Sequence, residues 1–222
     1  MSVGVKICGL NSREAADAAL KAGADFGGLV FFEKSPRHVG LDQAARLAQR
    51  LRPRVRVVTL LVDPDDATVD AVMTAIAPDL IQLHGNESPE RAGAIAERTG
   101  RAIIKAIAVA EASDVPRAHA YQDAVDYVLF DAKVDAVATR PGGWGAAFDW
   151  KLVSGSIFKK PFGVAGGLTP DNVARAIAIS GAQFVDASSG VEDAPGMKSP
   201  DKIAAFVSAA RNAQYTHVTG AA

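Results

Sequence analysis

Two side chains able to transfer protons occur where short apolar segments of the sequence end. Cys8 closes a segment that starts at Val3, and Asp131 directly follows the run Tyr127 to Phe130. A thiolate can act as a base or nucleophile, and a carboxyl group that burial keeps protonated can donate a proton. The alternatives are a small buried hydrophobe for Cys8 and a capping or loop acid for Asp131. Position alone does not decide between them.

Three more side chains near such segment ends could contact a ligand. The planar guanidinium of Arg37, in Ser35-Pro36-Arg37-His38, could hold a carboxylate, unless it is a solvated surface arginine. His84 and Asp186 stand at the ends of two other apolar segments. Histidine can ligate metals, but Cys8, His84 and the acidic residues lack dense ligand spacing, so we expect no metal site.

Two glycine-rich stretches end consecutive apolar segments and could bind a phosphate. They are Ala165-Gly166-Gly167-Leu168 and Asp186-Ala187-Ser188-Ser189-Gly190-Val191. Glycine lets backbone N–H groups approach an anion closely, and serine hydroxyls add donors. Either stretch alone could equally be a simple tight turn. The pair on neighbouring strands predicts a phosphate cradle formed by Gly166, Gly167, Ser189 and Gly190.

These candidates need a fold that brings the ends of many short segments together. Eight apolar, β-branched runs have the length of strands that are buried on both faces. Alanine-rich segments with helical spacing separate them. The eight runs are Val3 to Cys8, Phe26 to Phe31, Val55 to Val62, Leu80 to Leu83, Ala102 to Ile107, Val125 to Phe130, Phe162 to Ala165 and Phe184 to Ala187.

Eight strand–helix units predict an α/β protein with parallel strands. Right-handed crossovers then allow a closed barrel or a doubly wound open sheet, and eight units favour a single (β/α)8 TIM barrel. We expect the barrel to span residues 1–210 and a C-terminal tail, a candidate for disorder, to span 211–222. No linker and no sequence repeat beyond this rhythm is evident. The longest gap between strands holds Arg140-Pro141-Gly142-Gly143-Trp144-Gly145, either a mobile flap over the site or a passive loop.

Composition narrows the class of protein further. The chain has 222 residues, 49% of them hydrophobic, and 24 basic against 25 acidic residues give a net charge of −1. Without a basic excess we expect no nucleic-acid partner, and no apolar stretch is long enough to predict a membrane span or secretion signal. A single cysteine cannot form an internal disulfide, which fits a reducing, cytoplasmic setting. The sequence leaves monomer and homodimer open.

Six blocks of sequence, in order from residue 5 to about residue 206, resemble the phosphoribosylanthranilate isomerase family. The first and last blocks are the most specific. They are Val5-Lys6-Ile7-Cys8-Gly9-Leu10, Gly23 to Phe31, Ser35-Pro36-Arg37, Gln82-Leu83-His84-Gly85, Ala165-Gly166-Gly167-Leu168 with Asn172-Val173, and Val185 to Glu192 with Pro195-Gly196 and Lys198.

The resemblance implies an Amadori rearrangement in tryptophan biosynthesis that needs no cofactor. The substrate is the small molecule N-(5-phosphoribosyl)anthranilate, and the product is 1-(2-carboxyphenylamino)-1-deoxyribulose 5-phosphate. The resemblance further implies that Cys8 is the general base, that Asp131 is the general acid and that Arg37 binds the anthranilate carboxylate. The phosphate is implied on Gly166, Gly167, Ser189 and Gly190. We take His84 and Asp186 as additional substrate contacts.

Two departures and three rival functions accompany this interpretation. Trp144 stands in the glycine-rich segment where we expect a small or polar residue. The segment Leu60-Leu61-Val62-Asp63-Pro64 stands where we expect phenylalanine and asparagine at the end of the strand. Indole-glycerol-phosphate synthase would need a catalytic lysine set that is not found. The related histidine-pathway isomerase carries an aspartate where this chain has Cys8. A non-catalytic sugar-phosphate-binding barrel would keep the phosphate loops without needing the pair of Cys8 and Asp131.

Overall fold

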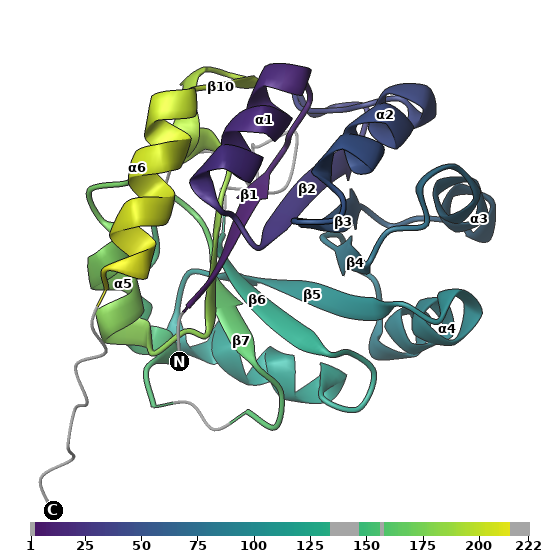
Figure 1. Ribbon diagram of the computed structural model, residues 1–222. Coiled ribbons are helices and arrows are strands. Elements are labelled where there is room, and N and C mark those ends of the chain that lie inside the picture. The colour runs from purple at the N-terminus through teal and green to yellow at the C-terminus, as the bar shows by residue number, and fades with distance from the viewer. Residues whose placement is uncertain (1–2, 134–146, 156–157, 214–222) are drawn as a thin grey trace, which may run out of the picture.

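The computed structural model describes residues 3–133, 147–155 and 158–213. In these residues eight parallel strands close into a barrel in the order β1 to β8 (Figure 1). The (β/α)8 barrel is therefore confirmed and the open sheet is wrong. The strands are β1 (Gly4–Cys8), β2 (Phe26–Phe31), β3 (Arg56–Leu61), β4 (Leu80–Leu83), β5 (Ala102–Val109), β6 (Tyr127–Ala132), β7 (Phe162–Val164) and β8 (Phe184–Ala187).

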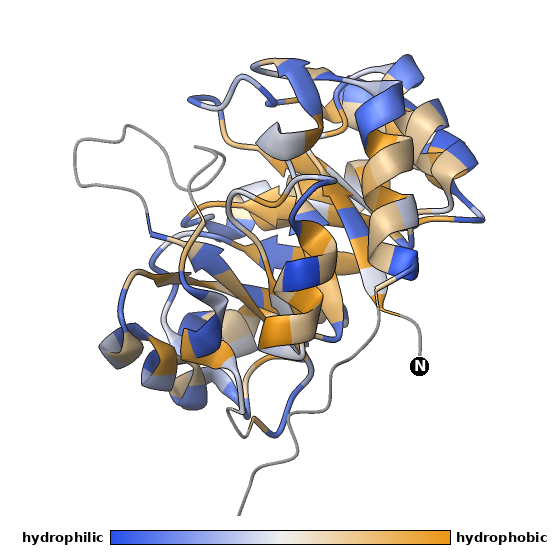
Figure 2. Ribbon diagram, turned by 90° about the vertical axis from the view of Figure 1, so that its left-hand side faces the viewer, coloured by the Kyte–Doolittle hydropathy of each residue, from blue (hydrophilic) through white to orange (hydrophobic). Residues whose placement is uncertain are grey.

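Helices cover the outside of the barrel, as Figure 1 shows. The strands inside are largely hydrophobic, whereas the helices carry hydrophilic residues on their outer surfaces (Figure 2). The α-helices are α1 (Arg13–Ala22), α2 (Leu41–Leu51), α3 (Asp66–Ile76), α4 (Pro89–Thr99), α5 (Val173–Ser180) and α6 (Pro200–Arg211). The 3₁₀ helices are η1 (Ala112–Tyr121), η2 (Trp150–Val153) and η3 (Ser189–Val191), and β9 (Glu192–Ala194) pairs with β10 (Met197–Lys198).

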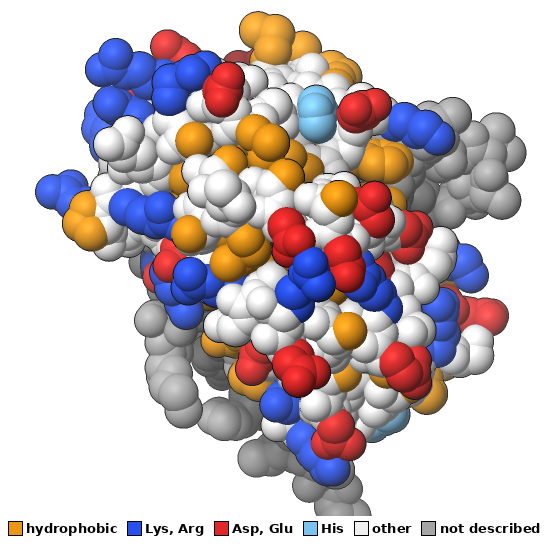
Figure 3. Space-filling view, turned by 90° about the vertical axis from the view of Figure 1, so that its right-hand side faces the viewer, with side chains coloured by type: hydrophobic (Ala, Val, Ile, Leu, Met, Phe, Trp, Pro, Cys, Tyr) orange, Lys and Arg blue, Asp and Glu red, His pale blue; other side chains and the backbone are white. Residues whose placement is uncertain are grey.

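The helix surface is held by ion pairs between neighbouring helices. Arg98 of α4 bonds Asp70 of α3 at 2.6 Å, and Arg91 of α4 bonds Asp66 of α3 at 2.6 Å. Figure 3 shows acidic and basic side chains interspersed over this face rather than gathered by sign. None of the described helices is both long enough and apolar enough to span a membrane. The segment 140–145 with Trp144, and residues 214–222 of the predicted tail, lie outside the described residues. The first residue of that tail, Arg211, is the last residue of α6.

A fourfold repeat that the sequence analysis did not find holds the amino ends of the strands. One polar residue precedes each even-numbered strand, and its side chain accepts the N–H of a residue in the odd-numbered strand before it. Each polar residue also donates its own N–H to the carbonyl of that same partner. The bonds join Asp25 to Val5 at 2.7 Å, Asp79 to Val57 at 2.7 Å, Asp126 to Ile103 at 2.8 Å and Gln183 to Phe162 at 2.9 Å.

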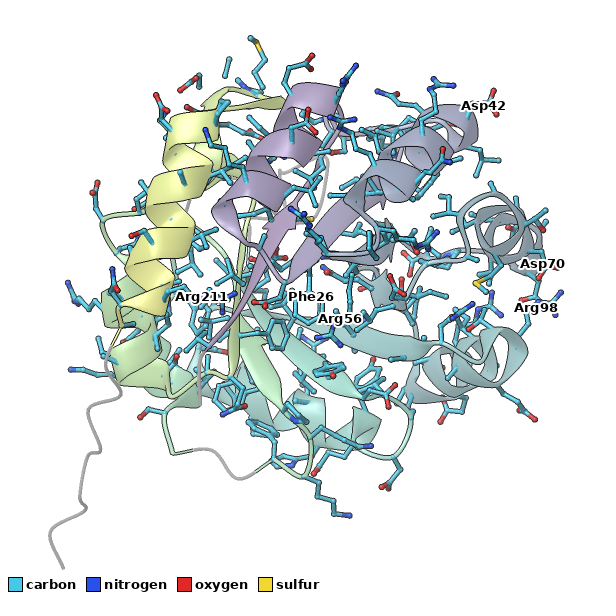
Figure 4. All side chains as sticks on the ribbon, in the orientation of Figure 1. Phe26, Asp42, Arg56, Asp70, Arg98 and Arg211 are labelled. Carbon is cyan, nitrogen blue, oxygen red and sulfur yellow. The ribbon has the colours of Figure 1, made fainter. Side chains whose placement is uncertain are left out.

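The residue after each of these four polar residues is large and points into the barrel. Phe26, Leu80, Tyr127 and Phe184 close the amino end of the interior. The Arg56 guanidinium lies 4.1 Å from the centre of the Phe26 ring. Figure 4 labels both side chains. A polar residue followed by a large one, at the start of every second strand, was therefore a readable sequence repeat. Our expectation of no such repeat was wrong.

The interior changes character toward the carboxyl ends of the strands. Side chains alternate between the inside and outside of a barrel strand, so residues two apart share a face. Two positions beyond the apolar layer, Gln82 and Asp186 face inward, and Lys6 of the adjacent strand joins them in the buried interior. Two positions further along are Cys8 and His84. The barrel is thus closed by hydrocarbon at one end and carries titratable groups toward the other.

Candidate active site

A pocket at the carboxyl ends of the strands contains every site residue that the sequence predicted. Together with the space that opens to solvent in front of it, the pocket holds about 670 Å³ of empty volume. Its walls also include apolar side chains such as Val30, Phe32 and Leu60. The nine predicted residues in its lining are Cys8, Arg37, His84, Asp131, Gly166, Gly167, Asp186, Ser189 and Gly190.

Cys8 is both buried and turned toward the pocket. It ends β1, is 5% exposed and packs with Val30 and Leu60. Burial raises the pKa of the Cys8 thiol, and the ammonium group of Lys6 offsets part of this effect. The two interpretations of Cys8 therefore do not exclude each other, because the same side chain packs in the core and lines the pocket. In the free protein the thiol form predominates at neutral pH.

Asp131 faces the pocket from β6 rather than from the loop after it. Its Oδ1 accepts the N–H of Ala132 at 2.9 Å, and its Oδ2 lies 3.1 Å from Nε2 of His84. The other ring nitrogen of His84, Nδ1, lies 2.9 Å from the side-chain amide of Gln82. The capping alternative for Asp131 is therefore wrong. His84, predicted as a substrate contact, has both ring nitrogens engaged by protein groups.

Arg37 is buried and already paired, which the sequence did not predict. Its Nε and Nη2 each donate to one carboxylate oxygen of Glu192 at 2.7 Å, and the side chain is 5% exposed. The solvated alternative is thus wrong. The stem of Arg37 packs on Gly9, where a Cβ would lie 2.6 Å from Cδ of the arginine. One edge of the guanidinium is occupied by Glu192, so a ligand carboxylate can only meet the edge that carries Nη1.

Lys198 is a second buried cation on the same carboxylate. Its Nζ bonds Glu192 at 2.6 Å and the carbonyl of Ser188 at 3.0 Å. Burial alone would raise the pKa of Glu192, but hydrogen bonds from Arg37 and the charge of Lys198 outweigh it, so that pKa lies below its ordinary value. Two cations against one anion leave a surplus positive charge. Both Glu192 and Lys198 belong to matched sequence blocks, but nothing in the spacing showed that they meet Arg37.

Asp186, predicted as a substrate contact, forms a buried ion pair. Its Oδ2 accepts a hydrogen bond from Nζ of Lys6 at 2.8 Å, and the lysine is fully buried. The charge of Asp186 raises the pKa of Lys6 above its ordinary value although burial acts in the opposite direction. The second oxygen, Oδ1, is buried and has no hydrogen-bond partner within the described residues. Buried polar atoms without a partner are rare, so this oxygen calls for an explanation.

The two predicted phosphate loops lie against each other. Gly166 and Gly167 adopt left-handed φ values of 79° and 60°, which side chains disfavour. A Cβ at Gly190 would overlap the carbonyl oxygen of Leu168, so only glycine lets the loops after β7 and β8 touch. The amides of Gly166, Gly167 and Gly190 donate no hydrogen bond to any described residue. Such unused N–H groups are what an anion site requires.

Two smaller predictions concern the rest of the site. Asp63 has a φ of 45°, a conformation that aspartate and asparagine both tolerate, so the turn after β3 does not depend on the asparagine that we expected. Its Oδ1 accepts the N–H of Asn86 at 2.6 Å, which ties the loops after β3 and β4 together. Among the described residues, no three His, Cys, Asp or Glu side chains are grouped so that they could hold a metal ion.

Comparison with known proteins adds a family and several relatives. Residues 5–209 match the family model described as N-(5'phosphoribosyl)anthranilate (PRA) isomerase. N-(5'-phosphoribosyl)anthranilate isomerase of Rhodopseudomonas palustris (strain HaA2) is 50% identical over 97% of this chain and 99% of its own. The relative of the same name from Caulobacter sp. (strain K31) is 50% identical over 94% of this chain and 99% of its own.

Solved structures agree with these matches. The crystal structure of phosphoribosyl anthranilate isomerase from Thermotoga maritima superposes with a TM-score of 0.84 at 35% identity, covering 94% of this chain and 98% of its own. A phosphoribosyl anthranilate isomerase in complex with reduced 1-(o-carboxyphenylamino)-1-deoxyribulose 5-phosphate gives a TM-score of 0.80 at 34% identity. It covers 94% of this chain and 98% of its own.

Proposed function

The chain belongs to the N-(5'-phosphoribosyl)anthranilate isomerase family, and from this premise we propose which of its residues perform each step. The reaction is an aldose–ketose isomerisation of tryptophan biosynthesis. It converts N-(5-phosphoribosyl)anthranilate into 1-(2-carboxyphenylamino)-1-deoxyribulose 5-phosphate. The non-catalytic barrel is therefore no longer a competing function. What remains to be assigned is the work of the individual side chains.

Asp131 is the general acid and Cys8 the general base of this proposal. Both line one pocket, and they stand on β6 and β1, which are three strands apart around the barrel. That separation lets them reach the substrate from different sides. Each positioned proton transfer contributes roughly 10²–10⁴-fold to the rate. This joint placement is the observation that carries the assignment.

The first two steps open the sugar and deprotonate it. Asp131 protonates the furanose oxygen, the C1–O bond breaks, and the lone pair of the anthranilate nitrogen forms the C1=N bond of an iminium ion. The iminium makes the C2 proton acidic. Cys8 as thiolate removes that proton, the electrons of the C2–H bond form C1=C2, and the C1=N electrons return to nitrogen. The product of these steps is an enolamine.

The last step restores both catalytic groups. The thiol of Cys8 returns its proton to C1, and the C2 hydroxyl loses its proton as the ketone forms. That proton reaches the carboxylate of Asp131, so the reaction is a net isomerisation with no atom gained or lost. No step requires an oxidant, a reductant or a further group.

His84 acts through Asp131 in this scheme. If Asp131 carries the proton on Oδ2, it donates to Nε2 of His84, and the ring must then donate from Nδ1 to the oxygen of the Gln82 amide. If Asp131 is ionised, His84 donates from Nε2 and the amide turns its nitrogen toward Nδ1. The distances of 3.1 Å and 2.9 Å suit both arrangements. The side-chain amide of Gln82 therefore turns over each time Asp131 gains or loses its proton.

Arg37 receives the anthranilate carboxylate, and the buried charge of Lys198 behind Glu192 adds to the positive charge that attracts it. Glu192 neutralises one of the two buried cations and fixes the plane of the Arg37 guanidinium with two bonds of 2.7 Å. A ligand carboxylate supplies the missing negative charge at the free edge. Charged hydrogen bonds of this kind are roughly twice as strong as neutral ones. Arg37 thus bridges two carboxylates, that of Glu192 and that of the substrate.

The phosphate binds to the unused amides of the loops after β7 and β8, together with the hydroxyl of Ser189. Held at its phosphate and at its carboxylate, the substrate has little freedom to rotate between acid and base. Such positioning can contribute about 7–11 kcal/mol to lowering a barrier. Asp186 lines the same pocket.

The whole described barrel is the catalytic unit, and we place its work in the cytoplasm, because the sole cysteine is used as a thiol. Either a monomer or a homodimer fits. One solved relative is described as monomers generated from a dimeric isomerase. Light scattering at assay concentrations decides between the two states for this chain.

The direct test is a fluorescence assay of phosphoribosylanthranilate consumption by the purified protein. We expect turnover without any added metal or cofactor, and loss of turnover in C8S and D131N. A protein that consumes the substrate equally well without Cys8 and without Asp131 would contradict the assignment of both roles.

A further inference from the structure

A buried ion pair lies directly beneath the proposed base. Lys6 is fully buried, Asp186 is 6% exposed, and Nζ and Oδ2 are 2.8 Å apart. Taking two charges out of water costs about as much as their attraction returns, so a buried pair contributes little to stability. The pair therefore needs a reason other than holding the barrel together.

Lys6 and Cys8 share the inner face of β1, two residues apart. The neighbouring residue on β2, paired in register with Cys8, is Gly28. A Cβ on Gly28 would lie 3.1 Å from Sγ of Cys8 and 3.2 Å from Nζ of Lys6. The missing side chain therefore leaves the sulfur and the ammonium group in one shared space inside the barrel.

A second buried lysine pair, on the outer face of the sheet, shows what a purely structural pair looks like. Lys105 bonds Glu87 at 2.6 Å, and both side chains are at most 2% exposed. The oxygens of Glu87 also accept the N–H groups of Asp63 and Gly85, at 2.9 to 3.1 Å. Glu87 is thus saturated. Asp186 is not, because its buried Oδ1 has no partner within the described residues.

We propose that Lys6 is a positioning residue that stabilises the thiolate of Cys8, and that Asp186 holds Lys6 in place and limits the strength of its effect. The inference rests on the proposed role of Cys8 as the base. A thiolate formed in a buried site needs a cation nearby, and Lys6 is the cation that the same strand supplies. The unpaired oxygen of Asp186 keeps negative charge close to the sulfur.

The charges around the sulfur oppose one another. Burial raises the pKa of Cys8, Lys6 lowers it, Asp186 raises it and Lys198 lowers it. The other charged groups of the pocket are Arg37, which is paired with Glu192, and the His84 and Asp131 pair across the cavity. Removing Lys6 therefore disfavours the thiolate, whereas neutralising Asp186 favours it. Opposite directions from two partners of one ion pair distinguish this role from a structural one.

The test measures the ionisation of Cys8 directly. Cys8 is the sole cysteine, so iodoacetamide reports one thiolate, which displaces iodide to form a thioether. Alkylation rates of the full chain are measured from pH 6 to 11, with mass spectrometry to count the labels. We expect Lys6→Met to move the midpoint up by about one pH unit or more, so that the rate at pH 8 falls about tenfold. Asp186→Asn moves the midpoint down.

The matched control is Lys105→Met, which breaks the buried pair of Lys105 and Glu87. We expect it to lower stability as much as Lys6→Met does, and to leave the alkylation midpoint where it is. Equal midpoints in the wild type and in Lys6→Met overturn the proposal. A shift of the same size in Lys105→Met also overturns it, because the effect is then a general loosening.

Two further variants keep the test decisive if Lys6→Met does not fold. Asp186→Asn is isosteric, and a midpoint that stays or rises contradicts the proposal. Gly28→Ala adds a methyl group to the space shared by Sγ and Nζ without altering charge, and we expect a higher midpoint. Alkylation does not depend on turnover. If Cys8 is not the base, C8S keeps full activity. If Lys6 does not stabilise the thiolate, only the alkylation midpoints show it.

Discussion

The two ends of the barrel differ in how far their polar groups are satisfied by hydrogen bonds within the protein. At the amino end, four polar residues in equivalent positions each saturate a backbone group of the neighbouring strand, over a layer of large apolar side chains. At the carboxyl end no such repeat occurs among the described residues, and the polar groups are unlike one another. There Asp186 keeps an unpaired oxygen, and the glycine loops keep unused N–H groups.

This difference separates stability from function along the barrel axis. Groups whose hydrogen bonds are all satisfied have nothing left to offer a ligand, so the amino end can only contribute to folding. Groups left unsatisfied cost stability unless a ligand binds them. Changes at the carboxyl end should therefore alter turnover more than folding, and changes at the amino end should do the reverse.

The largest expected effect is loss of turnover at the carboxyl end. Cys8→Ser replaces a titratable thiol with a hydroxyl that is barely ionised, and Asp131→Asn removes the proton that opens the sugar. Each should lower kcat by at least about 10²-fold and change KM much less, because substrate grip lies elsewhere. Steady-state kinetics with circular dichroism on both variants checks this. Near wild-type kcat in Cys8→Ser would make Cys8 a packing residue.

Arg37→Ala should weaken kcat/KM by roughly 2–4 kcal/mol, the range for truncating one partner of a buried charge pair. Because Glu192 keeps Lys198 as its partner in this variant, we expect the protein to remain folded. Arg37→Lys should also lose activity, since an ammonium group cannot offer one edge to Glu192 and another to the substrate carboxylate. Full activity in Arg37→Ala would mean that the carboxylate is held by other groups.

Gly167→Asp tests the phosphate cradle. The new carboxylate would stand where the phosphate binds and would have to adopt a φ of 60°. Like charges brought together cost several kcal/mol, so we expect KM to rise about tenfold or more. Competitive inhibition of the wild type by inorganic phosphate is the companion measurement. An unchanged KM in a folded variant rules out this loop as the phosphate site.

At the amino end the expected effect is on folding alone. Asp79→Ala leaves the buried N–H of Val57 without its acceptor, and we expect the free energy of unfolding to fall by about 1–3 kcal/mol. Asp79 lies at the amino end of β4, whereas the pocket lies at the carboxyl ends of the strands, so kcat and KM should stay at wild-type values. Urea denaturation and assays on the same sample measure both. A loss of kcat without a loss of stability would contradict the claim that the amino end of the barrel contributes to folding alone.

The smallest effect concerns Glu192 at acid pH. Its pKa in the folded protein lies below the ordinary value of 4.5, so the carboxylate stabilises the fold above that pH. The contribution disappears as the pH falls through the lowered pKa. The stability advantage of the wild type over Glu192→Gln should therefore shrink as the pH falls from 6 through the lowered pKa. A difference that stays constant with pH would show that the ionised carboxylate is not stabilising.

The elements of the barrel could be predicted because their signals are local. Each predicted strand overlaps an observed strand, and their ends differ by at most two residues. Parallel strands buried on both sides produce uninterrupted apolar runs, which a reader of the sequence can find one at a time. The predicted site residues followed from the same logic, since the ends of such strands meet at one side of a barrel.

The partnerships within the site could not be predicted, because they join residues that are far apart in the chain. Lys6 and Asp186 are 180 residues apart, and Arg37 and Glu192 are 155 apart. No periodicity in the sequence relates such residues. We therefore predicted an Arg37 guanidinium without a protein partner, whereas Glu192 occupies one of its edges. The fourfold repeat at the amino end is different, since its pattern was local and was overlooked.

The fourfold repeat also has a consequence for how the chain folds. Each side-chain bond joins an odd-numbered strand to the strand that follows it, across only 20 to 23 residues. Closing so short a loop costs little chain entropy, whereas joining β1 to β8 requires most of the chain to be ordered. The barrel therefore divides into four βαβ modules, each able to form its internal bonds before its neighbours arrive. Cooperative unfolding units measured by amide hydrogen exchange should follow these modules, with boundaries after β2, β4 and β6.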